Sequence, residues 1–406
     1  MNKKMFAYVG NWNFKLVDGR YDRGISCYSY DPEGGNLELI DVFDREVAAG
    51  QMCLDNENAR LYVAYEIGAK RGEIGGGGYL RSYSIDKETG ALSLISEIDS
   101  RGANPSYVCL TKDKKHLLAC HCADPHHANK IVKNEDGSFG VEVVMDDAPL
   151  ILVEVKEDGS LGRVEDVFIT GSNGKLKEDS RILTDPVTGH IQLTRVISRQ
   201  HAVIKSPDGE IFAVMDKGMD RVYTFRLENG KIVQADCFQD EIGVFPRYGA
   251  FHPTLPVLYT NNERACVIDV FNYDRSGKLS LMERVPSLKE EYKAKEYGDG
   301  VRPMGAQDIA VHPDGKTLYC TVEGGDNLIT VHRIKEDGTL ELIQNIDCEG
   351  YMPRGICISP DARFLLCGNN AGGDITVFNI EEDGTLKFTG KIFDSISPSV
   401  IKIAEF

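Results

Sequence analysis

Hydrophobic and polar positions along the chain alternate within two recurring phrases, and each phrase predicts a β-hairpin. The first phrase, as in "YSIDKETGALSL" and "FNIEEDGTLKFT", is a strand, a glycine-containing turn and a second strand. It occurs seven times, with the turn glycines Gly35, Gly90, Gly159, Gly230, Gly277, Gly338 and Gly384. The second phrase, as in "AVIKSPDGEIFAV", places a polar turn between two apolar strands and precedes most copies of the first.

Together the two phrases define a four-stranded unit, with strands A and B from the second phrase and strands C and D from the first. The N-terminal "KMFAYVG" supplies only a strand B, and the C-terminal "SPSVIKIAEF" supplies a strand A with nothing after it. Joining the two ends removes the exposed edges that an open array would leave. The sequence therefore predicts an all-β fold in one domain, 1–406. This fold is a seven-bladed β-propeller with four antiparallel strands per blade, closed by the C-terminal strand joining the N-terminal strands.

The extra length of the chain falls in the connections from strand B to strand C and from strand D to the next strand A. These long segments are residues 11–24, 66–80, 121–150, 171–200 and 285–303. In a meander of four strands, both kinds of connection lie at the same end of the blade. We expect all five insertions on one face, and because loops on a rigid scaffold often carry function, this is the expected working face.

Each strand A begins with a polar residue at the predicted mouth of the central channel. An alignment on the A–B turns gives Gln51, Ser106, His201, Arg247, Gln307 and Arg354, and Ser399 fits by its context. The ends of the B strands add Asn11, Glu66, His121, Asp216, Asn262 and Asn369, with Glu263 and Glu323 one residue further on. A wet channel accounts for serine and glutamine, but two arginines and a histidine in one register favour a site for a small anionic substrate.

Composition narrows the classes of partner. The 406-residue chain has a net charge of −17, which disfavours nucleic acid and anionic membranes because both attract clustered Lys and Arg. No N-terminal signal segment is evident, and no apolar run approaches the roughly 20 residues that cross a bilayer. We expect a cytoplasmic protein that binds a small molecule, and the oligomeric state stays open.

The eleven cysteines lie mostly within apolar runs, which favours buried reduced thiols over disulfides. The segment "CHC" at 120–122, with His126 and His127 nearby, resembles a zinc cluster, but its spacing matches no common ligand pattern. We therefore expect no metal and no cofactor.

Several segments resemble the lactonase family of seven-bladed β-propellers, which includes 6-phosphogluconolactonase and carboxy-cis,cis-muconate cyclase. They are "SRQHAVIKSPDG", "PRYGAFHP", "TNNE", "AQDIAVHPDGKTLY" and "MPRGICISPDARFLL", in that order. The resemblance implies a site with a histidine, an arginine, a glutamate and a later arginine. The first three match His201, Arg247 and Glu263, while the fourth matches Arg354 or, in "GVRPMG", Arg302.

The resemblance implies hydrolysis or formation of a lactone. Hydrolysis needs a base to activate water, either His201 or Glu263, and cationic donors such as Arg247 and Arg354 to stabilise the oxyanion. We expect a lactone hydrolase that acts on an anionic sugar-acid lactone, most like 6-phosphogluconolactonase. The expected substrate-binding residues are Gln51, Ser106, Gln307, Arg302, Glu66 and His121. The alternatives are a lactonising enzyme that takes a dicarboxylate, as the muconate cyclase does, and a propeller that only binds a partner.

Overall fold

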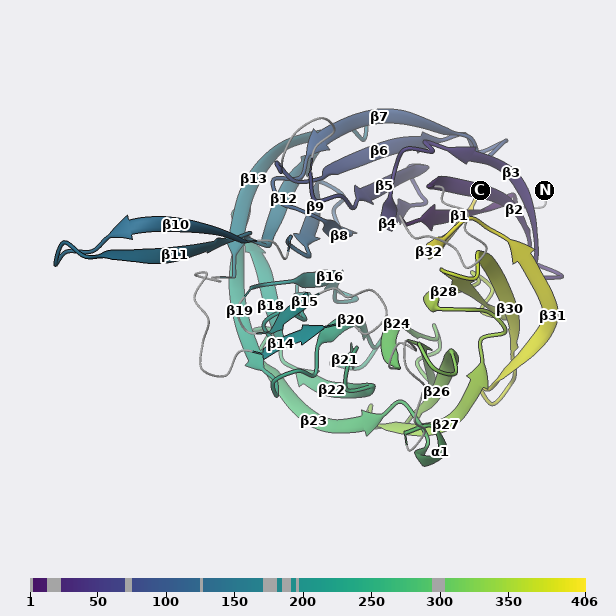
Figure 1. The fold of residues 1–406 in the computed structure, drawn as a ribbon. Helices are drawn as coiled ribbons and strands as arrows, with labels where there is room; N and C mark the ends of the chain where they lie inside the picture. The colour runs from purple at the N-terminus through teal and green to yellow at the C-terminus, as the bar shows by residue number, and fades with distance from the viewer. Residues whose placement is uncertain are drawn as a thin grey trace.

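Seven four-stranded antiparallel sheets form a ring in the computed structural model (Figure 1). The structure describes residues 3–12, 23–69, 75–124, 127–170, 181–184, 191–194, 197–293 and 304–406. Each sheet is one blade, and its strands follow one another from the centre of the ring to its rim. The predicted all-β, seven-bladed propeller is confirmed.

The strands of the first four blades are named from the innermost strand outwards. Blade 1 is β32 (Pro398–Glu405), β1 (Met5–Asn11), β2 (Gly24–Asp31) and β3 (Asn36–Phe43). Blade 2 is β4 (Ala49–Asp55), β5 (Arg60–Tyr65), β6 (Tyr79–Ile85) and β7 (Leu92–Asp99). Blade 3 is β8 (Pro105–Leu110), β9 (His116–His121), β12 (Pro149–Val155) and β13 (Leu161–Ile169). Blade 4 is β16 (Gln200–Lys205), β17 (Phe212–Asp216), β18 (Arg221–Glu228) and β19 (Lys231–Gln239).

The last three blades follow the same order. Blade 5 is β20 (Pro246–Phe251), β21 (Val257–Asn262), β22 (Val267–Tyr273) and β23 (Leu279–Pro286). Blade 6 is β24 (Gly305–Val311), β25 (Thr317–Glu323), β26 (Leu328–Ile334) and β27 (Leu340–Asp347). Blade 7 is β28 (Pro353–Ile358), β29 (Phe364–Asn369), β30 (Asp374–Ile380) and β31 (Leu386–Asp394).

The ring is closed by the two ends of the chain. Strand β32 pairs with β1 from Met5↔Glu405 to Asn11↔Pro398, so the C-terminal strand is the innermost strand of the first blade. The innermost strands of successive blades also contact one another all the way round, from β32 through β4 to β28 and back to β32. Both observations agree with the closure predicted from the two incomplete ends.

Apolar side chains fill the space between neighbouring blades. One buried cluster combines Met215 of blade 4, Tyr259 and Phe271 of blade 5, and Leu318 of blade 6. Because each strand alternates its side chains between two faces, the middle strands are buried on both sides. The core is therefore a series of layers between blades, and it leaves the polar starts of the innermost strands at the channel.

The repeated glycine of the C–D turn docks one blade onto the next. Gly338 of blade 6 has a φ of 86°, and its carbonyl accepts a hydrogen bond of 2.8 Å from the Tyr259 hydroxyl of blade 5. A Cβ at this position would lie 2.7 Å from Cγ2 of Val257. Gly90 and Gly384 likewise accept bonds from Tyr8 and Tyr319 of the preceding blades. The glycine is needed both for the turn and for this close approach.

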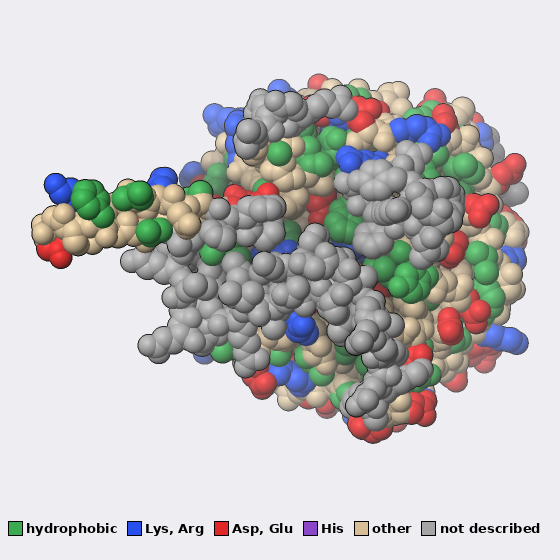
Figure 2. Space-filling model, viewed as in Figure 1, with side chains coloured by type: hydrophobic (Ala, Val, Ile, Leu, Met, Phe, Trp, Pro, Cys, Tyr) green, Lys and Arg blue, Asp and Glu red, His purple; other side chains and the backbone are tan. Residues whose placement is uncertain are grey.

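The insertions contain elements that the hydrophobic pattern did not predict. Strands β10 (His127–Lys133) and β11 (Phe139–Met145) pair as a separate hairpin, as do β14 (Arg181–Thr184) and β15 (Ile191–Thr194). The β10–β11 hairpin stands out from the rim and carries the exposed side chains of Ile131, Phe139 and Val141 (Figures 1 and 2). A short helix, α1 (Glu290–Lys293), lies in the last insertion. No helix of the described residues is long and apolar enough to cross a membrane.

We predict that Gly338→Ala destabilises the fold more than Gly230→Ala. Both glycines have positive φ in equivalent turns, so each substitution carries the left-handed penalty of about 1–2 kcal/mol. A Cβ at Gly230 meets no atom within 4 Å, whereas one at Gly338 is pressed against Val257. Urea unfolding of the two variants measures the difference, and equal losses of stability would show that crowding between blades is unimportant.

Candidate functional site

A β-bulge near the start of each innermost strand turns a side chain out of the ladder. The register shifts at Pro105/Tyr107, Gln200/Ala202, Pro246/Tyr248 and Pro353/Gly355 each skip one residue, and the shift at Ala306/Ile309 skips two. In blade 1, β32 contributes the skipped residue. The skipped positions hold Ser106, His201, Arg247, Gln307, Arg354 and Ser399. Bulges re-aim side chains in this way, and here they produce the ring of polar residues predicted from the sequence.

The position predicted for Gln51 is wrong by one residue, because the skipped residue of blade 2 is Gly50. Gln51 pairs with Ala64, and its side-chain oxygen accepts a bond of 2.9 Å from the Met52 N–H. The error arose in the count itself, which began one residue too far along the A–B turn, because the hairpin that starts at Ala49↔Tyr65 has the same length as the one that starts at Gln200↔Asp216 in blade 4. The ring position of blade 2 therefore has no side chain of its own.

Glu66 takes the space that Gly50 leaves. A Cβ on Gly50 would collide with Oε2 of Glu66, the residue that follows β5. The backbone N–H groups of Glu66 and Gly50 both donate to the Ala48 carbonyl at 3.0 Å. Burial raises the pKa of the Glu66 carboxyl, although Arg354 and other cations of the mouth oppose this shift. Glu66 thus contributes a carboxylate to the ring from outside strand β4.

Glu263 is held by two cations. Its Oε2 lies 2.8 Å from Lys217 Nζ and 3.1 Å from Arg247 Nε, and all three side chains are at most 10% exposed. Arg247 also donates a hydrogen bond of 2.8 Å to the Gln307 carbonyl and stacks its guanidinium over the Tyr248 ring at 4.8 Å. The charge pair and the stacking fix Arg247 in one orientation across blades 5 and 6.

Two cations of the mouth, Lys217 and Arg199, were not predicted from the sequence. Lys217 follows the end of β17 just as Glu263 follows β21 and Glu66 follows β5, so the offset that identified Glu263 could have identified Lys217. Arg199 immediately precedes β16, and its Nε has no hydrogen-bond partner among the described residues. Asp216, which was expected at the mouth, instead accepts bonds from the Ser198 hydroxyl and from nearby backbone N–H groups, including that of Arg199.

His201 is buried beside these cations. Its ring lies 5.4 Å from the Tyr248 ring, and its Nδ1 has no partner within the described part of the chain. Burial lowers its pKa well below the usual value, and the charges of Arg247, Lys217, Arg354 and Arg199 lower it further. The imidazole is therefore neutral at neutral pH.

Arg354 lies over the ring of the single tryptophan of the chain. Its guanidinium carbon is 4.2 Å from the centre of the Trp12 ring, so blade 7 is joined to blade 1 by a cation–π contact. The Nε of Arg354 has no hydrogen-bond partner in the described ranges. Because the indole supports one face of the guanidinium, its edge can point to a ligand in a defined orientation.

Other predicted residues have structural partners. Ser106 Oγ donates to the Gln200 carbonyl of the next blade at 2.7 Å, and Ser399 Oγ lies 2.9 Å from the Ala49 carbonyl. His121 is fully buried and its Nδ1 is 2.6 Å from the Pro149 carbonyl, which leaves it no access to a substrate. Gln307 keeps a buried Oε1 without a partner among the described residues. Arg302 and His126 lie outside the described residues.

Three buried residues at the ends of B strands form hydrogen bonds that support the scaffold. Asn11 accepts a bond from the Ser397 N–H, Asn262 donates to Asp269, and Asn369 donates to Asp374. Glu323 ends β25 and is also buried. Among the described residues, no three His, Cys, Asp or Glu side chains come together as metal ligands would.

The described mouth has more positive than negative charge. Arg199, Lys217, Arg247 and Arg354 act together on the pKa values of both His201 and Glu66. The carboxylates beside these four cations are Glu66, Glu263 and Asp216, and this cationic group contrasts with the net charge of −17 for the whole chain. Like charges held this close in a buried site repel one another unless an anion balances them, so the mouth suits an anionic ligand.

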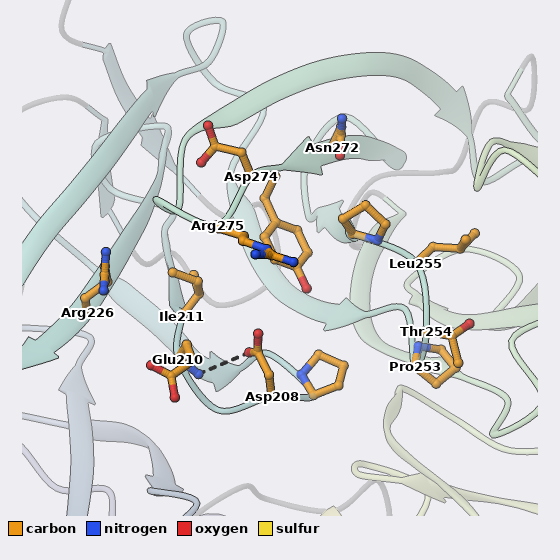
Figure 3. A pocket seen from close by; sticks show the side chains of 13 residues that line it. Asp208, Glu210, Ile211, Arg226, Pro253, Thr254, Leu255, Asn272, Asp274 and Arg275 are labelled. Atoms are coloured by element: carbon orange, nitrogen blue, oxygen red, sulfur yellow. Dashed lines mark hydrogen bonds between the residues drawn. The ribbon is translucent and has the colours of Figure 1, made fainter.

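The opposite face has a hollow of a different kind. Turn residues of blades 4 and 5 line a depression of about 860 Å³, which includes Asp208, Arg226, Asp274 and Arg275 (Figure 3). Asp208 accepts a bond of 3.1 Å from the Glu210 N–H within its own turn, and Asp274 similarly bonds Ser276. These carboxylates complete the turns, so we place the candidate site at the mouth.

The fold and this mouth define a seven-bladed propeller with a group of cations at one end of its channel. A family model described as lactonase, seven-bladed β-propeller, matches residues 8–133 and 154–403. The chain belongs to this lactonase family. The unmatched residues 134–153 include β11 of the projecting hairpin.

Individual relatives are distant but nearly full-length. The chain is 24% identical over 395 residues to a 6-phosphogluconolactonase of Formosa agariphila, covering 95% of this chain and 94% of the relative. It is 21% identical over 330 residues to the 6-phosphogluconolactonase of Bacillus subtilis, covering 81% and 79%. Its fold is similar to that of a periplasmic gluconolactonase of Pseudomonas aeruginosa, with a TM-score of 0.78, 21% identity and 99% of both chains covered.

We predict that Glu263→Gln destabilises the protein by about 3–5 kcal/mol, because it leaves Lys217 and Arg247 buried without their carboxylate. Glu341→Gln is the matched control, since it removes the same charge from a pair with Arg333 that is about half exposed. Such a surface pair contributes at most about 1 kcal/mol. Chemical denaturation compares the two variants, and similar small losses would contradict the structural role of the Glu263 cluster.

Proposed function

We propose that this protein hydrolyses a small anionic lactone, with 6-phosphogluconolactone as the leading candidate. The observation that carries the proposal is the cluster of four cations around Glu66 and His201 at the mouth of a strongly acidic chain. Membership of the lactonase family and the names of the distant relatives support the same reaction class. The activity would belong to carbohydrate metabolism, in the pentose phosphate pathway.

The cations have two tasks in this reaction. Attack of water on the lactone carbonyl places negative charge on the carbonyl oxygen, and a rigid cationic donor stabilises it. Arg247 suits this task because Glu263, Tyr248 and the Gln307 carbonyl already hold it in place. The Nε atoms of Arg354 and Arg199 have no hydrogen-bond partner among the residues that the structure describes. These guanidinium groups suit the phosphate or carboxylate of the substrate, which a guanidinium binds with two parallel hydrogen bonds.

The contacts of Glu263 favour a positioning role. As the shared partner of Lys217 and Arg247, its carboxylate oxygen would have to leave both cations in order to accept a proton. His201 is neutral, so it can orient water or the substrate through a hydrogen bond without adding a further positive charge. A substrate anion would offset the surrounding cations and raise the pKa of His201.

The proposal is tested by acid release from 6-phosphogluconolactone and from gluconolactone. We expect turnover of the phosphorylated lactone by the wild type. Arg354→Gln should raise its KM about 10–100-fold, because a charge-assisted contact of about 1.5–3 kcal/mol is lost. Arg333→Gln, which changes an exposed arginine of β26, is the matched control and should behave as the wild type.

The fluorescence of Trp12 reports binding in the same experiment, because the chain has one tryptophan and it stacks on Arg354. Titration with 6-phosphogluconate should change the emission of the wild type and have less effect on Arg354→Gln. Acid release no faster than without protein would rule out the hydrolase. A fluorescence change without turnover would instead support a propeller that only binds an anionic ligand.

We also propose a cytoplasmic location. The eleven free cysteines support it, since reduced thiols are typical of that compartment. Cell fractionation tests the proposal, and recovery from outside the cytoplasmic fraction would contradict it.

A further inference from the structure

The ring has seven equivalent positions, and one of them is occupied from a different strand. Six blades place a bulge side chain at the mouth, while blade 2 has Gly50 there. The Glu66 carboxylate lies directly over the Gly50 Cα, in the space that a side chain at this position would need. Since Gly50 has no positive φ, the turn itself does not require glycine. The space for Glu66 is therefore the structural reason for this glycine.

Glu66 differs from Glu263 in its contacts. No described residue forms a side-chain hydrogen bond or an ion pair with the Glu66 carboxylate, whereas Glu263 contacts Lys217 and Arg247 directly. The backbone bond from Glu66 N–H to the Ala48 carbonyl fixes the base of its side chain. Glu66 is thus positioned at the mouth with its carboxylate oxygens available to water or substrate.

The groups around Glu66 that carry charge or titrate are four cations and the buried phenol of Tyr248. Arg354, Arg247, Lys217 and Arg199 all favour the ionised carboxylate, and Tyr248 is the neighbouring titratable group on β20. Burial outweighs the cations and raises the pKa of Glu66 above that of an ordinary glutamate. A more basic carboxylate is a better proton acceptor, and its ionised form is the one that activates water.

We propose that Glu66 is the catalytic residue that transfers the proton during lactone hydrolysis, and that Gly50 is the residue that makes room for it. This role rests on the proposed function. Neighbouring groups suit it less: Glu263 is held by two cations, and protonation of His201 would add a positive charge beside four others.

The step conserves atoms and charge. The Glu66 carboxylate takes a proton from water as the water oxygen bonds to the lactone carbonyl carbon, and the carbonyl electrons move onto its oxygen. When the tetrahedral intermediate collapses, the bond from this carbon to the ring oxygen breaks and protonated Glu66 returns the proton to that oxygen. The products are a free hydroxyl and a carboxylic acid, which ionises in water. Glu66 ends as it began.

The test compares Glu66→Gln, Gly50→Ala and the double variant over a range of pH, using 6-phosphogluconolactone and subtracting spontaneous hydrolysis. We expect Glu66→Gln to lower kcat about 100-fold or more with little change in KM, and to remove the acidic limb of the pH profile. Gly50→Ala keeps the carboxylate but displaces it, so kcat should fall about 10-fold or more. The double variant should be no slower than Glu66→Gln alone.

Two controls separate chemistry from folding. Glu341→Gln makes the same substitution on the outer strand β27 and should leave kcat and the pH profile unchanged. Because the pKa of Glu66 is raised in the folded protein, removing its charge should not reduce stability at neutral pH, which thermal melting checks. Formate should restore part of the activity of Glu66→Ala, since it can occupy the vacated space and accept a proton.

The outcomes are distinguishable. If the wild type hydrolyses no lactone, the proposed function fails and this role fails with it. If the wild type is active and Glu66→Gln keeps both its kcat and its acidic limb, the role of Glu66 alone is overturned. The same holds if Glu263→Gln loses the acidic limb while Glu66→Gln retains it, because the base is then Glu263.

Discussion

The bulge at the entry of each innermost strand is the constraint on which the site depends. A regular antiparallel ladder would send alternate side chains into the layers between blades, where apolar residues are needed. By skipping a residue, the bulge lets His201, Arg247 and Arg354 leave the ladder at the mouth while the rest of each strand keeps its register. The residues at the mouth can therefore differ from blade to blade without a change in the apolar residues of the strands.

A buried polar ring needs rigid support, and the neighbouring blades supply it. Arg247 of blade 5 donates to a carbonyl of blade 6, and Lys217 of blade 4 forms an ion pair with Glu263 of blade 5. Arg354 of blade 7 lies over Trp12, which follows β1 of blade 1. Each contact crosses a boundary between blades, so closure of the ring by β32 and β1 also positions the charged groups. The cost of holding four cations together is offset by the neighbouring carboxylates and, in our proposal, by the substrate anion.

Much of the ring could be predicted because the signals are local. The A–B turn lies a constant number of residues from the bulge in most blades, so counting back from it located His201 and Arg247. The same count failed for Gln51, since it began one residue too far along the A–B turn of blade 2, whose bulge lies at Gly50. Lys217 and Arg199 were missed because they flank strands in positions where many charged residues are simply solvated, and their shared surroundings appear only in three dimensions.

The number of blades, the order of strands and the closure of the ring follow from the amino-acid sequence alone. Alternating apolar residues and turn glycines act over a few residues, and repetition makes their signal unambiguous. Which charged groups come into contact depends on how the blades pack in three dimensions. Lys217 and Glu263 lie on different blades, and Glu66 occupies the space over Gly50 because the backbone after β5 returns beside β4. Such contacts depend on how strands pack, and no local pattern encodes them.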